Sequence, residues 1–310
     1  MKILITEPEY FPQESRTVLE TVGRVTAKRL TRKELLSEIA DVDVLVVRIE
    51  TNVDREIIDA APKLKIIASA TTGLNHIDTA YAEELRIKVI NLVGNHTVPT
   101  AEHTFAMLLG LARKIPWAHA ELSSGKWERY KFFGRALEKK TLGIIGLGRI
   151  GSQVAKYAAG FRMRVLAYDP YVTKEYANSF GAELIDFDKL LSESDFISIH
   201  AALTHETRGM IGDREFAKMK PSAMLINVAR GEIVEPKALI RALESGRIAG
   251  AATDVFAAEP AGSNDLLVEY SKTHTNLLVT PHLGASTIEA INEASIFVAD
   301  KVVEAVRSGE

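Results

Sequence analysis

Short apolar runs alternate with longer amphipathic stretches along most of the chain. In the first third, four runs have the length and the β-branched character of buried strands: residues 2–6, 43–48, 64–68 and 88–92. Strands that alternate with helical patterns indicate a parallel sheet covered by helices. A longer helical pattern begins near Pro99, and we expect this helix to connect two domains. Its apolar face comprises Phe105, Leu108, Leu109 and Ala112.

A second series of apolar runs begins at Thr141. Six of them have the character of strands, at residues 142–145, 165–168, 196–199, 223–227, 250–255 and 277–280. Six strands are the number that a doubly wound dinucleotide-binding sheet needs. The last helical pattern, residues 287–306, is expected to return to the first domain. The prediction is an α/β protein with two doubly wound parallel-sheet (Rossmann-like) domains and a cleft between them. The first is flavodoxin-like (residues 1–98 plus 286–310) and the second is a Rossmann domain (residues 99–285).

The strand at 142–145 is followed by a glycine spacing typical of dinucleotide binding. Gly146, Gly148 and Gly151 form G-x-G-x-x-G directly before a helical pattern. The first glycine permits a tight turn, the second lets a pyrophosphate approach the backbone, and the third lets the helix pack close to the strand. Arg149 and Ile150 complete the turn, whose N–H groups face the phosphates at the helix N-terminus.

Asp169, at the end of the next strand, predicts NAD and not NADP as the cofactor. A carboxylate in this position accepts hydrogen bonds from the ribose hydroxyls and repels a 2′-phosphate. No Arg or Lys directly follows Asp169, and the nearest cation is Lys174. We therefore expect residues 99–285 to bind NAD and the other domain to bind the substrate.

Three residues with suitable chemistry follow three different predicted strands. They are Arg230, Glu259 and His282. Taken singly, an Arg in a turn, a Glu before a Pro and a core His are the simpler interpretations. Because ligands bind at the carboxyl edge of a parallel sheet, their shared position favours a catalytic set. Arg230 would hold a carboxylate through two hydrogen bonds, His282 would accept a hydroxyl proton, and Glu259 would orient the imidazole.

Composition and charge exclude several other functions. The chain has 310 residues, a net charge of −3 and no cysteine, and its basic residues are dispersed. We expect no nucleic-acid partner, no thiolate chemistry and no cysteine-bound zinc. None of the eight histidines has a metal-ligand spacing, so no metal is predicted. No apolar run approaches the roughly 18 residues of a membrane span, and a cytoplasmic location is expected.

Taken together, these motifs resemble the D-isomer-specific 2-hydroxyacid dehydrogenase family, and within it the D-3-phosphoglycerate dehydrogenases. The similarity covers nearly the whole chain and is densest at residues 125–129, 140–151, 225–231, 254–260 and 281–287. The resemblance implies an NAD-dependent oxidoreductase acting on a small 2-hydroxy or 2-oxo acid, with a place in serine biosynthesis. It also implies a homodimer formed through the NAD-binding domain.

The resemblance assigns roles to further residues. The catalytic set becomes Arg230, Glu259 and His282, and Asp254 contacts the nicotinamide carboxamide. Additional cofactor contacts are implied for Thr204, Val228, Ala229 and Gly284. The substrate would be bound by Arg230, by Arg48 and by the loop of Thr72, Gly73, Leu74 and Asn75, whose N–H groups face the substrate carboxylate.

Three departures from the phosphate-binding members concern the substrate. Ser69 replaces a common Arg, Glu50 follows Arg48 where a small neutral residue is usual, and residues 73–78 read Gly-Leu-Asn-His-Ile-Asp and not Gly-Val-Asp-Asn-Ile-Asp. A glyoxylate/hydroxypyruvate reductase, or a reductase of another unphosphorylated 2-oxo acid, is therefore the alternative. A non-enzymatic NAD-sensing corepressor is a second alternative. A methyltransferase would leave Arg230, Glu259 and His282 unexplained.

Overall fold

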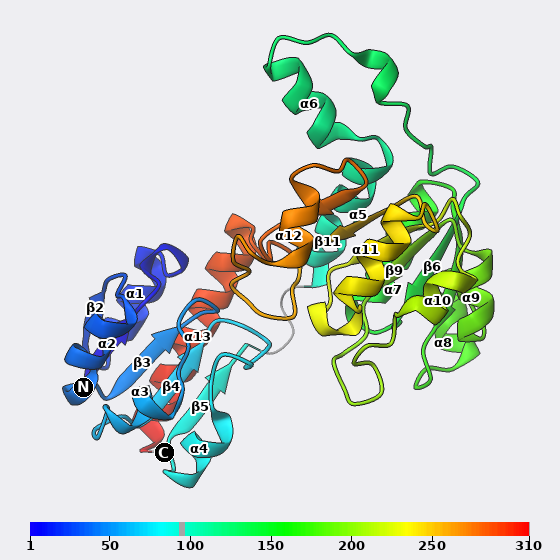
Figure 1. The fold of residues 1–310 in the computed structure, drawn as a ribbon. Coiled ribbons are helices and arrows are strands. Elements are labelled where there is room, and N and C mark those ends of the chain that lie inside the picture. Colours follow the sequence, from blue (N-terminus) through cyan, green and yellow to red (C-terminus); the bar gives the residue numbers. More distant parts are fainter. Residues whose placement is uncertain (93–96, 310) are drawn as a thin grey trace. The chain divides into compact units, whose positions relative to one another are not determined.

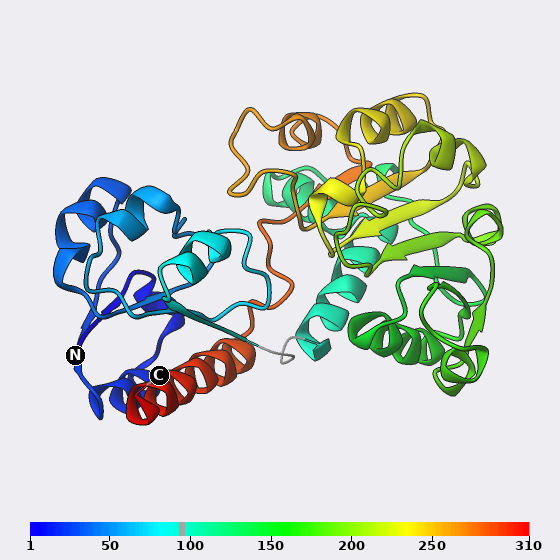
Figure 2. The same ribbon diagram turned by 90° about the horizontal axis from the view of Figure 1, so that it is seen from below.

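The computed structural model describes residues 1–92 and 97–309, which form two compact units. Unit 1 comprises Met1–His96 with Ser286–Glu310, and unit 2 comprises Thr97–Ala285. Each unit contains one parallel β-sheet covered by helices, which confirms the predicted α/β class with two doubly wound sheets (Figures 1 and 2). The division lies two residues before the predicted one, because Thr97 and Val98 form the first turn of a helix.

Within its described residues, unit 1 has a sheet of five parallel strands in the order β2-β1-β3-β4-β5. This order is the flavodoxin-like one. The strands are β1 (Lys2–Ile5), β2 (Arg24–Ala27), β3 (Val44–Val47), β4 (Ile66–Ser69) and β5 (Lys88–Asn91). The helices are α1 (Gln13–Glu20), α2 (Arg32–Glu38), α3 (Arg55–Asp59), α4 (Thr79–Glu84) and α13 (Ile288–Ser308), with 3₁₀ turns η1 (Pro8–Tyr10) and η2 (Ile39–Asp41).

Two apolar layers bury the faces of this sheet. One layer joins Leu19 of α1 and Val298 and Val302 of α13 to the strands, and Figure 2 shows these two helices side by side. The opposite layer joins Leu35 of α2 and Ile57 of α3 to the other face. Strand β2 was not predicted, because it is an edge strand with alternating exposed and half-buried residues and has no apolar run.

Unit 2 has a seven-stranded sheet in the order β12-β11-β10-β9-β6-β7-β8, within residues 97–285. Its strands are β6 (Thr141–Ile145), β7 (Arg164–Tyr168), β8 (Ala182–Leu184), β9 (Phe196–Ile199), β10 (Met224–Asn227), β11 (Gly250–Thr253) and β12 (Leu277–Val279). Six of the seven were predicted. The three-residue β8 was not, because it is too short to show a period.

The helices of unit 2 lie on both faces of this sheet (Figure 1). They are α5 (Thr97–Ala112), α6 (Ile115–Ser123), α7 (Arg149–Gly160), α8 (Lys174–Ser179), α9 (Phe187–Glu193), α10 (Asp213–Lys218), α11 (Pro236–Glu244) and α12 (Leu266–Ser271), with 3₁₀ turns η3 (Arg129–Lys131) and η4 (Gly231–Ile233). Helix α5, predicted to connect the two domains, begins at the first residue of unit 2, and its Phe105, Leu108 and Leu111 are buried in the core of that unit.

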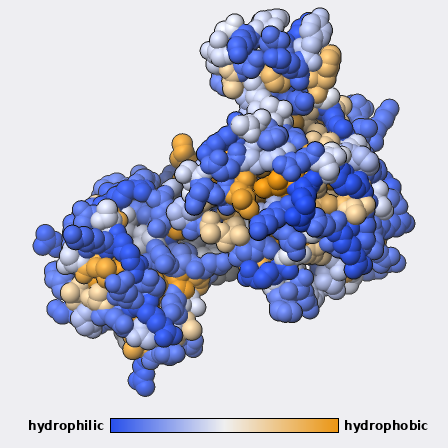
Figure 3. Space-filling view, viewed as in Figure 1, coloured by the Kyte–Doolittle hydropathy of each residue, from blue (hydrophilic) through white to orange (hydrophobic). Residues whose placement is uncertain are grey.

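Residues 115–136 form an extension of unit 2 that we call the arm. Lys114, at φ 55°, is the N-cap of α6, and the arm continues through α6 and the following loop away from the sheet (Figure 1). The arm exposes three aromatic side chains, since Trp127 and Tyr130 are each 78% exposed and Phe133 is 76% exposed. Figure 3 shows apolar residues in orange among polar ones on this part of the surface.

Candidate active site

In the glycine turn after β6, close packing requires glycine at two of the three glycine positions. Gly146 has φ +90°, and a Cβ there would lie 2.7 Å from the Ala201 nitrogen. A Cβ on Gly151 would lie 2.1 Å from the Gly146 oxygen, so only glycine allows α7 to begin so close to the strand. Gly148 is different, because a Cβ there would meet open space. The turn is therefore tightly packed on its inner side and open on its outer side.

The N-terminus of α7 fits an anionic group such as a pyrophosphate. Gly148 is its N-cap, and it has no side chain that can accept a hydrogen bond from the first-turn N–H groups. Arg149 is exposed and Ile150 is half-buried at this end of the helix. These residues fit the phosphates of NAD.

Asp169 connects the end of β7 to the glycine turn. Its Oδ2 accepts a hydrogen bond from the Leu147 N–H at 2.8 Å, and its Oδ1 accepts one from the Tyr171 N–H at 2.9 Å. Each carboxylate oxygen has two lone pairs, so both oxygens keep capacity to accept from ribose hydroxyls. The arrangement fits the predicted ribose contact.

His282 and Glu259 form a hydrogen-bonded pair. His282 Nδ1 lies 2.6 Å from Glu259 Oε2, and the two side chains are 32% and 30% exposed. The other oxygen, Glu259 Oε1, accepts the Phe256 N–H at 2.9 Å, which fixes the carboxylate in its loop. With Nδ1–H donating to the carboxylate, His282 Nε2 is the acceptor for a proton from another group. The pair therefore has the geometry of an oriented base.

The Arg230 turn is built by Asn227 at the end of β10. Asn227 Nδ2 donates to the Arg230 oxygen at 2.9 Å, and its Oδ1 accepts the Ala229 N–H at 3.1 Å. A Cβ on Gly231 would lie 2.0 Å from the Phe256 carbonyl carbon, so this turn packs directly on the loop that carries Glu259. The half-buried Arg230 has one guanidinium N–H bonded to the Ala229 oxygen at 2.7 Å.

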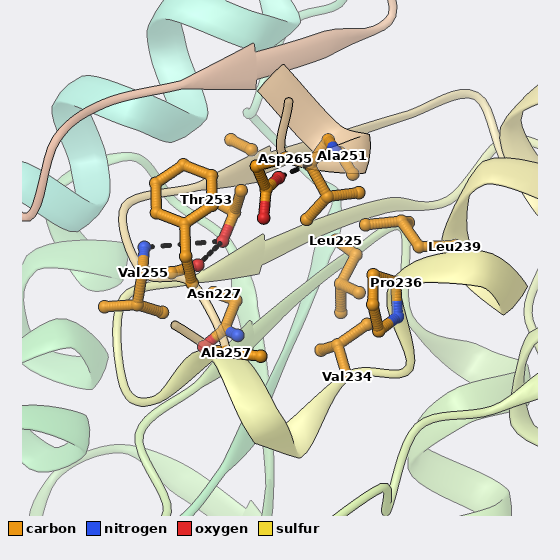
Figure 4. Close-up of a pocket in the computed structure, with 14 residues that line it drawn as sticks. Leu225, Asn227, Val234, Pro236, Leu239, Ala251, Thr253, Val255, Ala257 and Asp265 are labelled. Carbon is orange, nitrogen blue, oxygen red and sulfur yellow. Dashed lines mark hydrogen bonds between the residues drawn. The ribbon is translucent and has the colours of Figure 1, made fainter. Parts of the chain in front are cut away.

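A cavity of about 30 Å³ lies behind these two loops, between the ends of β10 and β11. Figure 4 shows Asn227, Thr253 and Val255 on one side and Val234 and Pro236 on the other. The space is large enough for one water and too small for a 2-hydroxy acid. It belongs to the packing behind the loops and is not a substrate pocket.

Asp254 follows β11 and is 1% exposed. Its Oδ1 accepts hydrogen bonds from the Thr280 hydroxyl at 2.5 Å and from the Leu283 N–H at 2.8 Å. Its Oδ2 accepts the Gly284 N–H at 2.8 Å, and His103 Nε2 lies 3.2 Å from Oδ1. The sequence pattern around His103 gives no signal for this contact, since its partner is 151 positions away in the chain.

The remaining predicted cofactor contacts in unit 2 lie in loops after strands. Thr204 is exposed, and its hydroxyl accepts the Glu206 N–H at 3.2 Å within a tight turn after β9. Val228 is buried and Ala229 is half-buried after β10. All of these residues follow the carboxyl ends of strands that are adjacent in the sheet.

The predicted substrate residues Arg48 and Thr72–Asn75 belong to unit 1. In the loop, the carbonyls of Thr72, Gly73 and Leu74 accept bonds from Asn91 Nδ2, Thr71 Oγ1 and the Ile77 N–H. Thr72 and Asn75 are exposed, and Gly73 and Leu74 between them are half-buried. Leu74 also lines a cavity of about 420 Å³ beside α4 and β5.

Arg48 and Glu50 have partners within unit 1. The Arg48 guanidinium carbon lies 4.2 Å from the centre of the Tyr10 ring. Glu50 Oε2 lies 2.6 Å from Arg29 Nη1, and Arg29 also pairs with Glu9 at 2.6 Å. Glu50 therefore has a cationic partner, Arg29, which it shares with Glu9.

The two departures at positions 69 and 76 contact each other. The Ser69 hydroxyl is fully buried and lies 2.7 Å from Thr71 Oγ1 and 3.1 Å from His76 Nε2. Burial lowers the pKa of His76 to about 4, so its ring is neutral near pH 7. An Arg at position 69 would have to displace these two partners.

Comparison with known proteins identifies the family. Residues 105–284 match the D-isomer specific 2-hydroxyacid dehydrogenase NAD-binding domain. The chain belongs to this family. Its glycine turn, Asp169 and the Glu259–His282 pair all lie within the matched NAD-binding domain.

Similar proteins cover nearly the whole chain. D-3-phosphoglycerate dehydrogenase of Methanocaldococcus jannaschii is 45% identical over 309 residues, which are 99% of this chain and 58% of that protein. The chain spans little more than half the length of the curated relatives it matches. The TT0316 protein of Thermus thermophilus has a similar structure, with a TM-score of 0.87, 32% identity and coverage of 100% and 98%. D-lactate dehydrogenase of Aquifex aeolicus, complexed with NAD and lactic acid, has a TM-score of 0.83, 29% identity and coverage of 100% and 96%.

Neither a membrane-spanning helix nor a metal cluster occurs within residues 1–92 and 97–309. None of the helices in these ranges has the length and apolar character needed to cross a bilayer. In the same part of the chain, no three His, Asp or Glu side chains gather as metal ligands.

Proposed function

We propose that this chain catalyses NAD-dependent interconversion of a short 2-hydroxy acid and its 2-oxo acid. The observation that carries the proposal is the 2.6 Å bond between Glu259 and His282. This pair lies at the carboxyl edge of the sheet that also carries the glycine turn, where a parallel α/β sheet binds its ligands. D-3-phosphoglycerate is the leading substrate, because the curated relative named above, at 45% identity, is a D-3-phosphoglycerate dehydrogenase.

Each member of the catalytic set has a distinct role in this reaction. Arg230 binds the substrate carboxylate and so orients C2. In the oxidation, His282 Nε2 accepts the proton of the C2 hydroxyl while the C2 hydrogen leaves with its electron pair. The negative charge of Glu259 stabilises the imidazolium that results. NAD⁺, when bound, accepts the hydride.

The protein's residues also select the cofactor. Asp169 would accept the adenosine ribose hydroxyls, whereas a 2′-phosphate beside it would meet a like charge. We expect the kcat/KM ratio to favour NAD over NADP by roughly tenfold or more, about 1.4 kcal/mol.

Ser69 favours a second candidate, the reduction of an unphosphorylated acid such as glyoxylate or hydroxypyruvate. The buried cluster of Ser69, Thr71 and His76 offers no cation to a phosphate, because His76 is neutral near pH 7. A lost charge-assisted contact costs about 1.5 to 3 kcal/mol. We therefore expect phosphohydroxypyruvate to exceed hydroxypyruvate by less than about tenfold in kcat/KM.

The deciding experiment measures NADH oxidation with glyoxylate, hydroxypyruvate, pyruvate, 2-oxoglutarate and phosphohydroxypyruvate. The same panel is repeated with His282→Asn, which should lower kcat by roughly 100- to 10,000-fold while NADH still binds. Tight NADH binding without turnover of any acid would contradict the proposal and favour the corepressor alternative. Unchanged turnover in His282→Asn would remove His282 as the proton acceptor.

We further propose that the protein is a cytoplasmic homodimer joined through the NAD-binding domain. The exposed aromatic side chains Trp127, Tyr130 and Phe133 of the arm support this contact. Aromatic residues are enriched in protein interfaces, and a second copy of the same chain offers the matching surface.

A further inference from the structure

Helix α5 lies against the loop that carries His282. Thr100, His103 and Met107 are spaced along one helix face. His103 Nε2 is 3.4 Å and Met107 Sδ is 3.3 Å from the Thr280 hydroxyl oxygen. A Cβ on Gly284 would lie 3.4 Å from Thr100 Cγ2. Three residues on one face of α5 thus lie against residues 280–284.

The Asp254 carboxylate connects this helix to the loop. It accepts bonds from the Thr280 hydroxyl, the Leu283 and Gly284 N–H groups and His103. Burial alone would raise the pKa of Asp254, but the hydrogen bonds from His103, Thr280 and Leu283 outweigh burial and hold the pKa below its ordinary value. A buried carboxylate is tolerated only with such partners, so each bond also fixes the orientation of the others.

The backbone of His282 needs this support. His282 has φ +54°, which is uncommon for a residue other than glycine and persists where the surroundings determine it. Its N–H donates to the Asp254 backbone oxygen at 2.8 Å and to the Thr280 backbone oxygen at 3.1 Å. Asp254 therefore bonds the loop at positions 280, 282, 283 and 284, on both sides of the proposed base.

We propose that His103 is a positioning residue for the reaction. By donating from Nε2 to Asp254 Oδ1, it fixes the carboxylate and, through it, the backbone that aims His282 at the substrate. This inference rests on the proposed role of His282. In this inference, the Asp254 carboxylate connects two parts of the protein, because its oxygens are bonded to α5 and to the loop.

The test compares His103→Gln with His103→Asn. The Gln side chain places an N–H at the reach of Nε2, whereas the Asn side chain is one methylene shorter. Ala106→Leu, on the exposed face of the same helix, is the matched control. For each variant, kcat, KM for the best 2-oxo acid and Kd for NADH are measured. Amide hydrogen exchange at Leu283 and Gly284 is followed in the free protein.

We expect His103→Asn to lower kcat by about tenfold or more, with KM and the NADH Kd within about threefold, since a displaced base affects chemistry more than binding. Exchange at Leu283 and Gly284 should accelerate by about tenfold, and His103→Gln should restore both values to within about threefold. Unchanged exchange in both variants would overturn the positioning role. A raised NADH Kd with unchanged exchange would overturn it too, in favour of a direct cofactor contact.

The exchange measurement needs no substrate, so the two proposals fail separately. If His282→Asn abolishes turnover while exchange is insensitive to position 103, only the positioning role is wrong. If His282→Asn keeps full turnover, the proposed function is wrong, whatever the exchange shows.

Discussion

The Glu259 carboxylate forms two hydrogen bonds, one with the His282 ring and one with the Phe256 N–H. Replacing Glu259 by Gln keeps an oxygen for the Phe256 N–H but removes the negative charge beside the imidazole. A charge-assisted bond contributes about 1.5 to 3 kcal/mol, so kcat should fall by roughly ten- to a hundredfold. Steady-state kinetics with Glu244→Gln, on the exposed end of α11, provides the control. Equal rates for Glu259→Gln and the parent protein would show that Glu259 does not assist the base.

His76 predicts a pH dependence of stability. Burial lowers its pKa to about 4, against 6.5 for an ordinary histidine, so protonation favours the unfolded chain. The contribution of His76 is full above pH 6.5, falls as the pH drops toward 4, and is worth about 1.4 kcal/mol for each unit of pKa shift. In His76→Gln, the free energy of unfolding should therefore depend less on pH in this window.

Denaturant titrations at about pH 7, 5.5 and 4.5 check this prediction. The exposed His205, replaced by Gln, is the control. Parallel pH curves for His76→Gln and the parent protein would mean that folding does not change the pKa of His76. Burial of its ring also lowers the pKa of the half-buried His200, to about 3, so protonation of His200 likewise favours the unfolded chain. This residue remains unchanged in both variants.

At the scale of elements, the β6–α7 turn allows steric and binding effects to be separated. Gly151→Ala places a methyl 2.1 Å from the Gly146 oxygen, so α7 must shift and the protein should lose stability. Gly148→Ala meets open space, so its melting temperature should stay unchanged. Its affinity for NADH should nevertheless fall by about tenfold or more if a pyrophosphate approaches that backbone.

Fluorescence titration with NADH and thermal denaturation distinguish the two effects. Gly160→Ala, at the far end of α7 and also in open space, controls for glycine replacement. An unchanged NADH Kd in Gly148→Ala would mean that the phosphates bind elsewhere.

The sequence predicts those elements that have a strong apolar period and misses those that do not. Buried strands such as β3 and β10 appear as continuous apolar runs because both of their faces are covered. The edge strand β2 and the short β8 lack such a run. Within the candidate site, the strand-end position indicated Glu259 and His282. The His103–Asp254 contact joins residues that are distant in sequence and has no local signal.

At the scale of the whole molecule, the arm should control the oligomeric state. Replacing Trp127, Tyr130 and Phe133 by Ala removes three exposed aromatic side chains that belong to neither core layer of unit 2. The folded unit should remain intact because none of the three is buried. Sedimentation should show a shift from dimer to monomer at micromolar concentration. Replacing the exposed Tyr171, Tyr176 and Leu266 outside the arm is the matched control. A parent protein that is itself monomeric would contradict the proposed dimer.

The packing of α13 against α1 has a consequence for synthesis on the ribosome. Unit 1 is complete only when α13 packs against residues that precede unit 2, whereas unit 2 is one continuous segment. Val298 and Val302 emerge from the ribosome after the whole of unit 2, and until then one face of the unit 1 sheet lacks part of its cover. Unit 2, which is inserted within unit 1, is therefore free to fold first. Meanwhile the nascent unit 1 exposes an apolar sheet face that chaperones can bind.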